Sequence, residues 1–131
     1  MILLDTHVVI WMVSDSSQLS RTAARELRKG ERAGELAIAS ITLWELALLY
    51  QRGRLRSSGT IESSIRRIVE KSRVHVLEIT PEIADLSRSF PDSYPKDPGD
   101  RLIGATARAC GLTLITQDER ILSSPLIRSL W

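Results

Sequence analysis

Several acidic side chains of this chain occupy positions where carboxylates could do chemistry together. Asp5 directly follows the apolar run Ile2–Leu4, and Asp118 lies two residues beyond a second apolar run that ends at Thr116. Carboxylates that gather at the ends of neighbouring strands can bind a cation and activate water. Each of these acids taken singly is more typical of a helix N-cap, so the inference depends on whether other acids join them.

Glu45 is the acid that is hardest to explain as a solvated side chain. It lies in the mostly apolar segment Ile41–Leu49, and on a helix its face neighbours are Ile41, Thr42, Leu48 and Leu49. A buried carboxylate is destabilising unless a partner or a metal ion compensates its charge. The alternative is a helix that turns the Glu45 side chain toward solvent.

The sequence Asp97-Pro98-Gly99-Asp100 indicates different roles for its two aspartates. If Asp97 is a helix N-cap, Pro98 occupies the first helical position, which proline favours, and Asp100 occupies the third. The carboxylate of Asp97 is then engaged by backbone N–H groups beside the site. Asp100 projects from the first helical turn and is free to face the site.

The elements that must position these acids are short apolar runs that alternate with helix-forming segments. Strands are expected at residues 2–4, 36–39, 74–79 and 112–116, and helices at 8–13, 21–29, 41–52, 60–72, 81 to about 90, and 98–110. Ser20, Ser40 and Thr80 are expected to cap helices, and Gly30 is expected to end the second helix. The alternation predicts an α/β fold, in which a parallel sheet of four to five short strands has helices on both faces, within a single domain 1–131. The tail 121–131 is ambiguous.

The four acids are expected to meet at one edge of this sheet. Ligands of open parallel sheets bind beyond the carboxyl ends of the strands, so we expect Asp5, Glu45, Asp100 and Asp118 to converge there. Four neighbouring carboxylates repel one another unless a cation lies among them. Oxygen ligands suit Mg²⁺ or Mn²⁺, whereas two scattered histidines and one cysteine offer no zinc site. Such a metal centre predicts hydrolysis of phosphodiester bonds.

Basic side chains are concentrated in the middle of the chain. The net charge is only +2, but residues 21–73 contain twelve Lys or Arg against six Asp or Glu. Arginine is a bidentate partner for phosphate, so Arg52, Arg54 and Arg56 are candidate contacts to a nucleic-acid backbone. Arg101 is a further candidate, although an ion pair at the surface is the stronger expectation for it. The alternative for the whole basic region is an ordinary solvated helix face.

The sequence offers no signal for secretion or membrane insertion. No stretch approaches the ~18 apolar residues of a membrane span, and the apolar run at the N-terminus carries Asp5 and His7 without a basic leader. The single cysteine, Cys110, rules out an intramolecular disulfide and is expected to be a small, reduced core residue. These features predict a cytoplasmic protein.

Four segments, in this order, resemble the PIN-domain ribonucleases, and above all the VapC toxins of bacterial and archaeal toxin–antitoxin pairs. They are L-L-D-T-H-V-V-I-W at 3–11, S-I-T-L-W-E-L-A at 40–47, D-P-G-D-R-L-I-G-A-T-A at 97–107 and L-T-L-I-T-Q-D-E at 112–119. The resemblance implies a Rossmann-like domain and Mg²⁺- or Mn²⁺-dependent endonucleolytic cleavage of RNA. It also implies a homodimer and inhibition by a VapB-like antitoxin.

The resemblance also implies roles for single residues. Asp5, Glu45, Asp100 and Asp118 match the four acids of the family, and the first and third of these are its usual metal ligands. Glu45 and Asp118 are then further ligands, directly or through water.

Other matched positions are less decisive. Thr6 and Thr116 match small hydroxyl residues beside the site, which hold a water or a carboxylate or else cap turns. Gly99 departs from the pattern, because a bulky residue often stands there in related sequences, and it either loosens the loop or leaves room beside the metal. His7 and Trp11 fit a subset of the family, but packing is the stronger expectation for both.

Two other functions remain open at this point. A catalytically silent module on the same fold, binding RNA or a protein, would use the acids only as caps and surface charges, but it has no reason to retain all four. A phospho-acceptor receiver domain needs an acidic pair after its first strand and a lysine after a late strand. Here Thr6 follows Asp5, and no lysine lies after Lys96.

Overall fold

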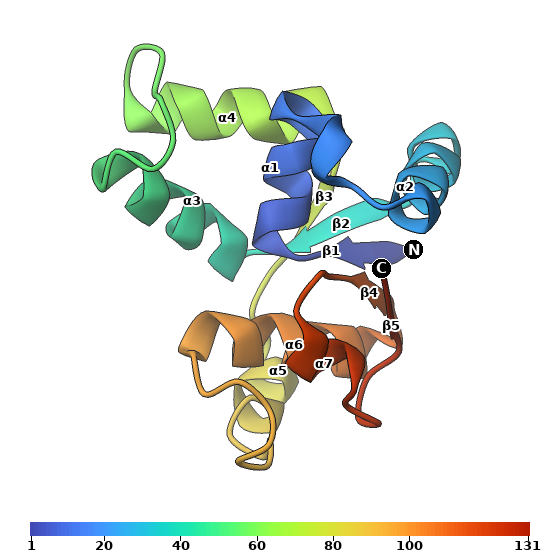
Figure 1. Cartoon of the computed structure of the whole chain (residues 1–131). Coiled ribbons are helices and arrows are strands. Elements are labelled where there is room, and N and C mark those ends of the chain that lie inside the picture. Colours follow the sequence, from blue (N-terminus) through green and yellow to red (C-terminus); the bar gives the residue numbers. More distant parts are fainter.

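A single parallel sheet organises the fold. A computed structural model, which describes residues 1–131, places five strands in the order β3-β2-β1-β4-β5 (Figure 1). The strands are β1 (Ile2–Leu4), β2 (Leu36–Ala39), β3 (His75–Leu77), β4 (Thr113–Ile115) and β5 (Ser129–Leu130). Leu3 of the central strand β1 pairs with Ala37 of β2 on one side and Leu114 of β4 on the other. The expected α/β fold with a parallel sheet is confirmed, and the ambiguous tail supplies the fifth strand.

Helices cover both faces of the sheet, with α1 to α4 on one face and α5 to α7 on the other (Figure 1). They are α1 (Thr6–Ser14), α2 (Arg21–Ala33), α3 (Ile41–Gln51), α4 (Ile61–Ser72), α5 (Pro81–Leu86), α6 (Pro98–Cys110) and α7 (Glu119–Leu122), with a 3-10 turn at Ser16–Gln18. Successive side chains of a strand point to opposite faces, so β1 sends Leu3 into the α5–α7 core and Leu4 into the α1–α4 core. No helix is both long and apolar enough to span a membrane.

The helix ends correct some of the expected boundaries. Helix α2 runs through Gly30 to Ala33 and ends at Gly34, whose φ of 67° is in the left-handed region. Gly30 is required for packing instead, because a Cβ there would lie 2.5 Å from Cδ2 of Leu36. Ser40 makes no side-chain capping bond, and Cys110 is exposed rather than part of the core.

The segment between α5 and α6 is a loop that packs tightly against α6. Helix α5 ends at Leu86, four residues earlier than the expected end near Phe90. Phe90 and Tyr94 are buried and stack with ring centroids 4.2 Å apart, over a position where α6 has only Gly104. The Tyr94 hydroxyl donates to the carbonyl of Asp100 at 3.2 Å. This loop therefore fixes the first turn of α6, which carries one of the four acids.

Candidate active site

A cleft of about 610 Å³ opens at the carboxyl edge of the sheet, beyond β1 and β4. Its lining comes from the starts of α1, α6 and α7 and the middle of α3: Asp5, Thr6, His7, Val8, Trp11, Glu45, Asp100, Gln117, Asp118 and Glu119. The four acids singled out in the sequence therefore share one cleft, as the topology of a parallel sheet predicts.

Both oxygens of the Asp5 carboxylate are held by the protein. Oδ1 accepts the backbone N–H of Thr6 at 2.8 Å, and Oδ2 accepts the hydroxyl of Thr116 at 2.7 Å. The Thr116 hydroxyl in turn accepts the backbone N–H of Asp118 at 3.1 Å. Because Thr116 is fully buried, this chain of bonds fixes the orientation of Asp5 and ties the end of β1 to the start of α7.

Glu45 is anchored by a second pair of hydroxyls. Its Oε1 accepts the Thr6 hydroxyl at 2.6 Å, and that hydroxyl lies 3.0 Å from the hydroxyl of Thr42. A hydroxyl has one proton to donate, so the Thr42 hydroxyl must donate to Thr6. On its other side Glu45 fills the space left by Gly99, where an added Cβ would lie 2.5 Å from Oε2. The room expected beside a metal at Gly99 is thus occupied by Glu45.

The aspartates of the α6 start divide as the sequence indicates. Asp97 is the N-cap, and its Oδ2 accepts the backbone N–H of Asp100 at 3.1 Å. The Asp100 carboxylate has no hydrogen bond or ion pair within the chain. The pKa of Asp100 rises to about 7 through its burial and through repulsion, first from Asp5 and then from Asp97, Glu45 and Asp118.

Glu45 is affected in the same direction as Asp100. Burial, with repulsion from Asp5 and Asp97, raises the pKa of Glu45 against the opposing effect of the Thr6 hydroxyl. Asp118 alone has a basic neighbour, since its Oδ2 lies 3.5 Å from the largely exposed guanidinium of Arg120. A bound cation would therefore be stabilised by the negative charge of this cleft.

The donors fit a hydrated divalent ion better than a closed metal cage. No group of three or more acid, histidine or cysteine side chains is close enough to surround an ion. Mg²⁺ is usually bound by one or two carboxylates and keeps several waters, which leaves room for substrate phosphate. The unpaired carboxylate of Asp100 next to the oriented carboxylate of Asp5 meets that requirement.

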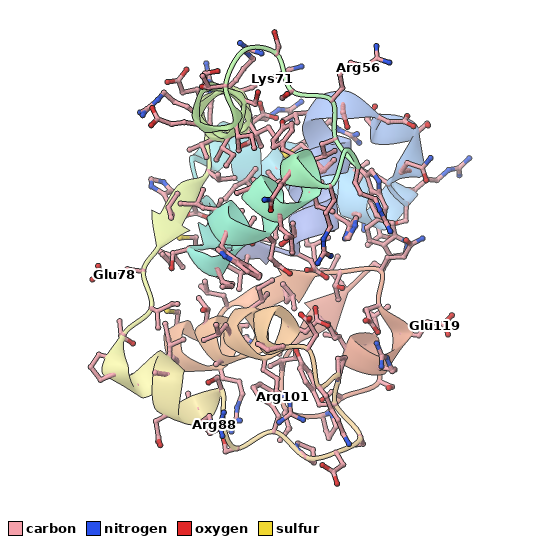
Figure 2. The ribbon with its side chains drawn as sticks, turned by 90° about the vertical axis from the view of Figure 1, so that its left-hand side faces the viewer. Arg56, Lys71, Glu78, Arg88, Arg101 and Glu119 are labelled. Carbon is pink, nitrogen blue, oxygen red and sulfur yellow. The ribbon has the colours of Figure 1, made fainter.

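The basic residues expected to contact RNA lie outside the cleft. Arg52, Arg54 and Arg56 are exposed at the end of α3 and just beyond it, and Figure 2 shows Arg56 well apart from Glu119 on the cleft rim. Whether they touch RNA stays a prediction.

Arg101 makes neither the expected ion pair nor a contact in the cleft. Its guanidinium donates to the carbonyls of Phe90, Pro91 and Pro95 at 3.1, 3.2 and 3.0 Å. Its rigid fork of donors therefore serves to hold the loop before α6, on the α5–α7 side of the molecule (Figure 2).

Five residues of the cleft, one of them the buried Val8, were given no role there by the sequence. Gln117 and Glu119 flank Asp118, and their proximity to that acid was the available signal. His7 and Trp11 were expected to pack, but both line the cleft, one helical turn apart on α1. Their four-residue spacing directly after Asp5 indicates a shared helix face but not which way the face points.

A family model described as the PIN domain matches residues 2–124 of the chain. The chain belongs to the PIN-domain family. This PIN domain is 38% identical over 122 residues to Ribonuclease VapC22 of Mycobacterium tuberculosis, a match that covers 93% of this chain and 90% of the relative. The resemblance to VapC proteins inferred from the four segments is confirmed.

Several solved structures share this fold. VapBC2 from Rickettsia felis, bound to a DNA fragment from its promoter, matches with a TM-score of 0.73 and 18% identity over 99% of this chain and 98% of that one. FitAcB from Neisseria gonorrhoeae matches with a TM-score of 0.69 and 22% identity over 100% and 97%. At these identities the two structures support the fold of this PIN domain.

Proposed function

We propose that this PIN domain, formed by residues 1–131, is a metal-dependent endoribonuclease and the toxin of a toxin–antitoxin pair. Its relation to a protein named a ribonuclease supports the activity. The observation that carries the mechanism is the half-buried, unpaired carboxylate of Asp100, whose pKa is raised to about 7 by burial first and by neighbouring acids second. A carboxylate that is half-buried among other acids without a partner destabilises the fold, but it stabilises a bound cation.

Asp5 and Asp100 hold the metal, which is Mg²⁺ or Mn²⁺, and Glu45 and Asp118 complete the acidic shell directly or through water. When bound, the ion supplies a nucleophile from water at neutral pH and neutralises charge on the phosphodiester. Mg²⁺ suits the geometry around Asp5, because each oxygen of this carboxylate already accepts one hydrogen bond and keeps one further lone pair.

The neighbouring residues act by orientation. Thr6 and Thr116 fix the carboxylates that they contact, and Asp97 fixes the first turn of α6 and so the direction of Asp100. Ligand groups held in this way need no rearrangement when the metal and the phosphate arrive.

The proposed partner is a VapB-like antitoxin, and the toxin itself forms a homodimer in the cytoplasm. A solved structure that shares the fold over the whole of this chain is a toxin–antitoxin complex from Klebsiella pneumoniae. A surface for such contacts exists on the α3–α4 side, where the side chain of Trp44 is 61% exposed. Leu43, Ile65, Val69 and Val76 line an apolar groove there.

Cleavage of RNA by the purified protein, with and without Mg²⁺ or Mn²⁺, tests this function. We expect cleavage that needs the metal and that is abolished by Asp5→Asn and by Asp100→Asn. Asp92→Asn is the matched control, because Asp92 is an exposed acid outside the cleft. Cleavage that survives Asp100→Asn would contradict the assignment. Absence of both cleavage and Mg²⁺ binding would favour a silent module on the same fold.

A further inference from the structure

Aromatic rings form one wall of the acidic cleft, and the proposed chemistry does not use them. His7 and Trp11 both line the cleft, with ring centroids 5.8 Å apart and ring planes at 46°. Trp131 continues the row, with its centroid 5.8 Å from that of Trp11. Two of the three tryptophans of the chain thus lie at or beside the site.

The row is built by two elements that the sequence does not bring together. His7 and Trp11 lie one turn apart on α1 and therefore share a helix face. Trp131 directly follows β5, whose parallel pairing with β4 delivers it to the carboxyl edge of the sheet. The N–H of Thr116 donates to the carbonyl of Leu130 at 3.1 Å, which fixes that position. The aromatic row and the acids therefore lie at the same edge.

Packing accounts for Trp11 but not for His7. Trp11 is half-buried between the two other rings, as expected for a residue that anchors the segment after β5 to α1. The side chain of His7 is exposed, and its one aromatic neighbour within the chain is Trp11. A ring whose task was packing alone would be covered, so a face of the row is available to a ligand.

The charge of the cleft favours binding of RNA through its bases over binding through its phosphates. Apart from His7, every titratable side chain that lines the cleft is an acid: Asp5, Glu45, Asp100, Asp118 and Glu119. One divalent ion and the Arg120 guanidinium beside Asp118 compensate only part of that charge, so contacts to phosphate cannot supply most of the binding in the cleft. Stacking of bases on aromatic rings stabilises RNA binding without any need for positive charge.

We propose that His7 and Trp11, supported by Trp131, are a stacking platform for an unpaired base next to the scissile phosphate. This inference rests on the proposed ribonuclease function. Bases in a duplex are stacked on each other and cannot be received by the platform, so double-stranded RNA is excluded.

Equilibrium binding of RNA to the full chain tests the platform. The protein carries Asp100→Asn to prevent cleavage, Mg²⁺ is present, and the probe is a labelled single-stranded oligonucleotide of mixed sequence. Loss of one base stack corresponds to a weakening of about 5-fold to 100-fold, so His7→Ala is expected to fall in that range. His7→Phe keeps a flat ring and should bind as the parent does. His75→Ala is the control, because His75 is the second histidine and lies exposed on β3.

Each result either supports the platform or overturns it. The same oligonucleotide annealed to its complement should bind at least about tenfold more weakly, since its bases are not free to stack. Equal binding of the duplex, or unchanged binding by His7→Ala, would overturn the platform. If His7→Phe loses as much as His7→Ala, His7 contacts RNA as a polar group and the stacking role is wrong.

The platform and the nuclease activity can fail separately. Metal-dependent cleavage by the unsubstituted protein, together with unchanged binding by His7→Ala, leaves the nuclease standing and removes the platform. Weakened binding by His7→Ala, with no cleavage by the unsubstituted protein, supports an RNA-binding platform and removes the nuclease.

Discussion

Replacement of Gly99 by alanine tests the packing between α6 and Glu45. The new Cβ would lie 2.5 Å from Oε2 and 2.9 Å from Cδ of Glu45, and 3.0 Å from Oδ2 of Asp97. Separations this short do not persist, so one group has to move. The Glu45 carboxylate is the free end of a side chain, but the Thr6 hydroxyl holds it at 2.6 Å. Its displacement breaks that hydrogen bond.

The size of the effect follows from two opposing contributions. A hydrogen bond to a charged group stabilises by about 1.5–3 kcal/mol, and its loss is the main destabilising contribution. Alanine in place of glycine at a compatible helical position stabilises by about 0.4–1 kcal/mol through the unfolded chain. We therefore expect Gly99→Ala to lower the free energy of unfolding by about 1–2 kcal/mol, a fall in Tm of about 4–8 °C for a chain of this size. Cleavage should fall with it, because Glu45 leaves its place in the cleft.

A double-mutant cycle assigns the loss to Glu45. The free energy of unfolding is measured by urea denaturation for the parent, Gly99→Ala, Glu45→Ala and the double variant. In the Glu45→Ala background only the Asp97 contact remains, so Gly99→Ala should be neutral or stabilising. An equal destabilisation by Gly99→Ala in both backgrounds would refute the reasoning. Glycine would then be required at position 99 by a contact other than the one with Glu45.

Three further predictions concern the acids and their anchors. In the metal-free protein, the free energy of unfolding should fall by about 2 kcal/mol as the pH rises from 4 to 7. The pKa of Asp100 is about 7 in the folded state against its usual 3.8, so the folded state binds an extra proton across this range and loses it as the pH rises. The carboxylate is partly exposed, which keeps the effect well below that of a fully buried group. Urea denaturation at both pH values checks this, and saturating Mg²⁺ or Asp100→Asn should remove the fall. Asp97→Asn retains a good N-cap and should keep most of the cleavage activity. Asp100→Asn should abolish cleavage and raise Tm. Similar effects of the two substitutions on cleavage would mean that both acids share the site. Thr116→Val removes the hydroxyl that donates to Asp5 and leaves the Asp118 N–H unpaired. The free energy of unfolding should therefore drop by about 1–3 kcal/mol, and the cleavage rate should fall about tenfold. An unchanged cleavage rate would show that Asp5 needs no hydrogen bond from Thr116 for catalysis.

The convergence of the acids could be predicted because it depends on topology more than on detail. Asp5 and Asp118 follow apolar runs, and once those runs are parallel neighbours their carboxyl ends must meet. The division between Asp97 and Asp100 depended only on local helix-capping preferences, which a four-residue sequence displays in full.

The features that could not be predicted depend on contacts between distant segments. Whether Gly30 ends a helix or allows close packing is decided by Leu36, which approaches it only in the folded chain. The donors of Arg101 go to carbonyls of a loop whose path no pattern fixes. The position of Trp131 depends on β5, a strand of two residues that is too short to show alternation.

The hydrogen bond from Thr116 to Asp5 joins residues 111 positions apart in the sequence. This separation determines when the cleft can form during protein synthesis. During synthesis β1 is made well before its neighbour β4, so the growing chain carries Asp5 for a time without its anchor and without the start of α7. At typical rates of translation this interval lasts roughly 5–20 s. A nascent chain, or one broken off before β4, has no complete cleft and cannot cut the RNA around it.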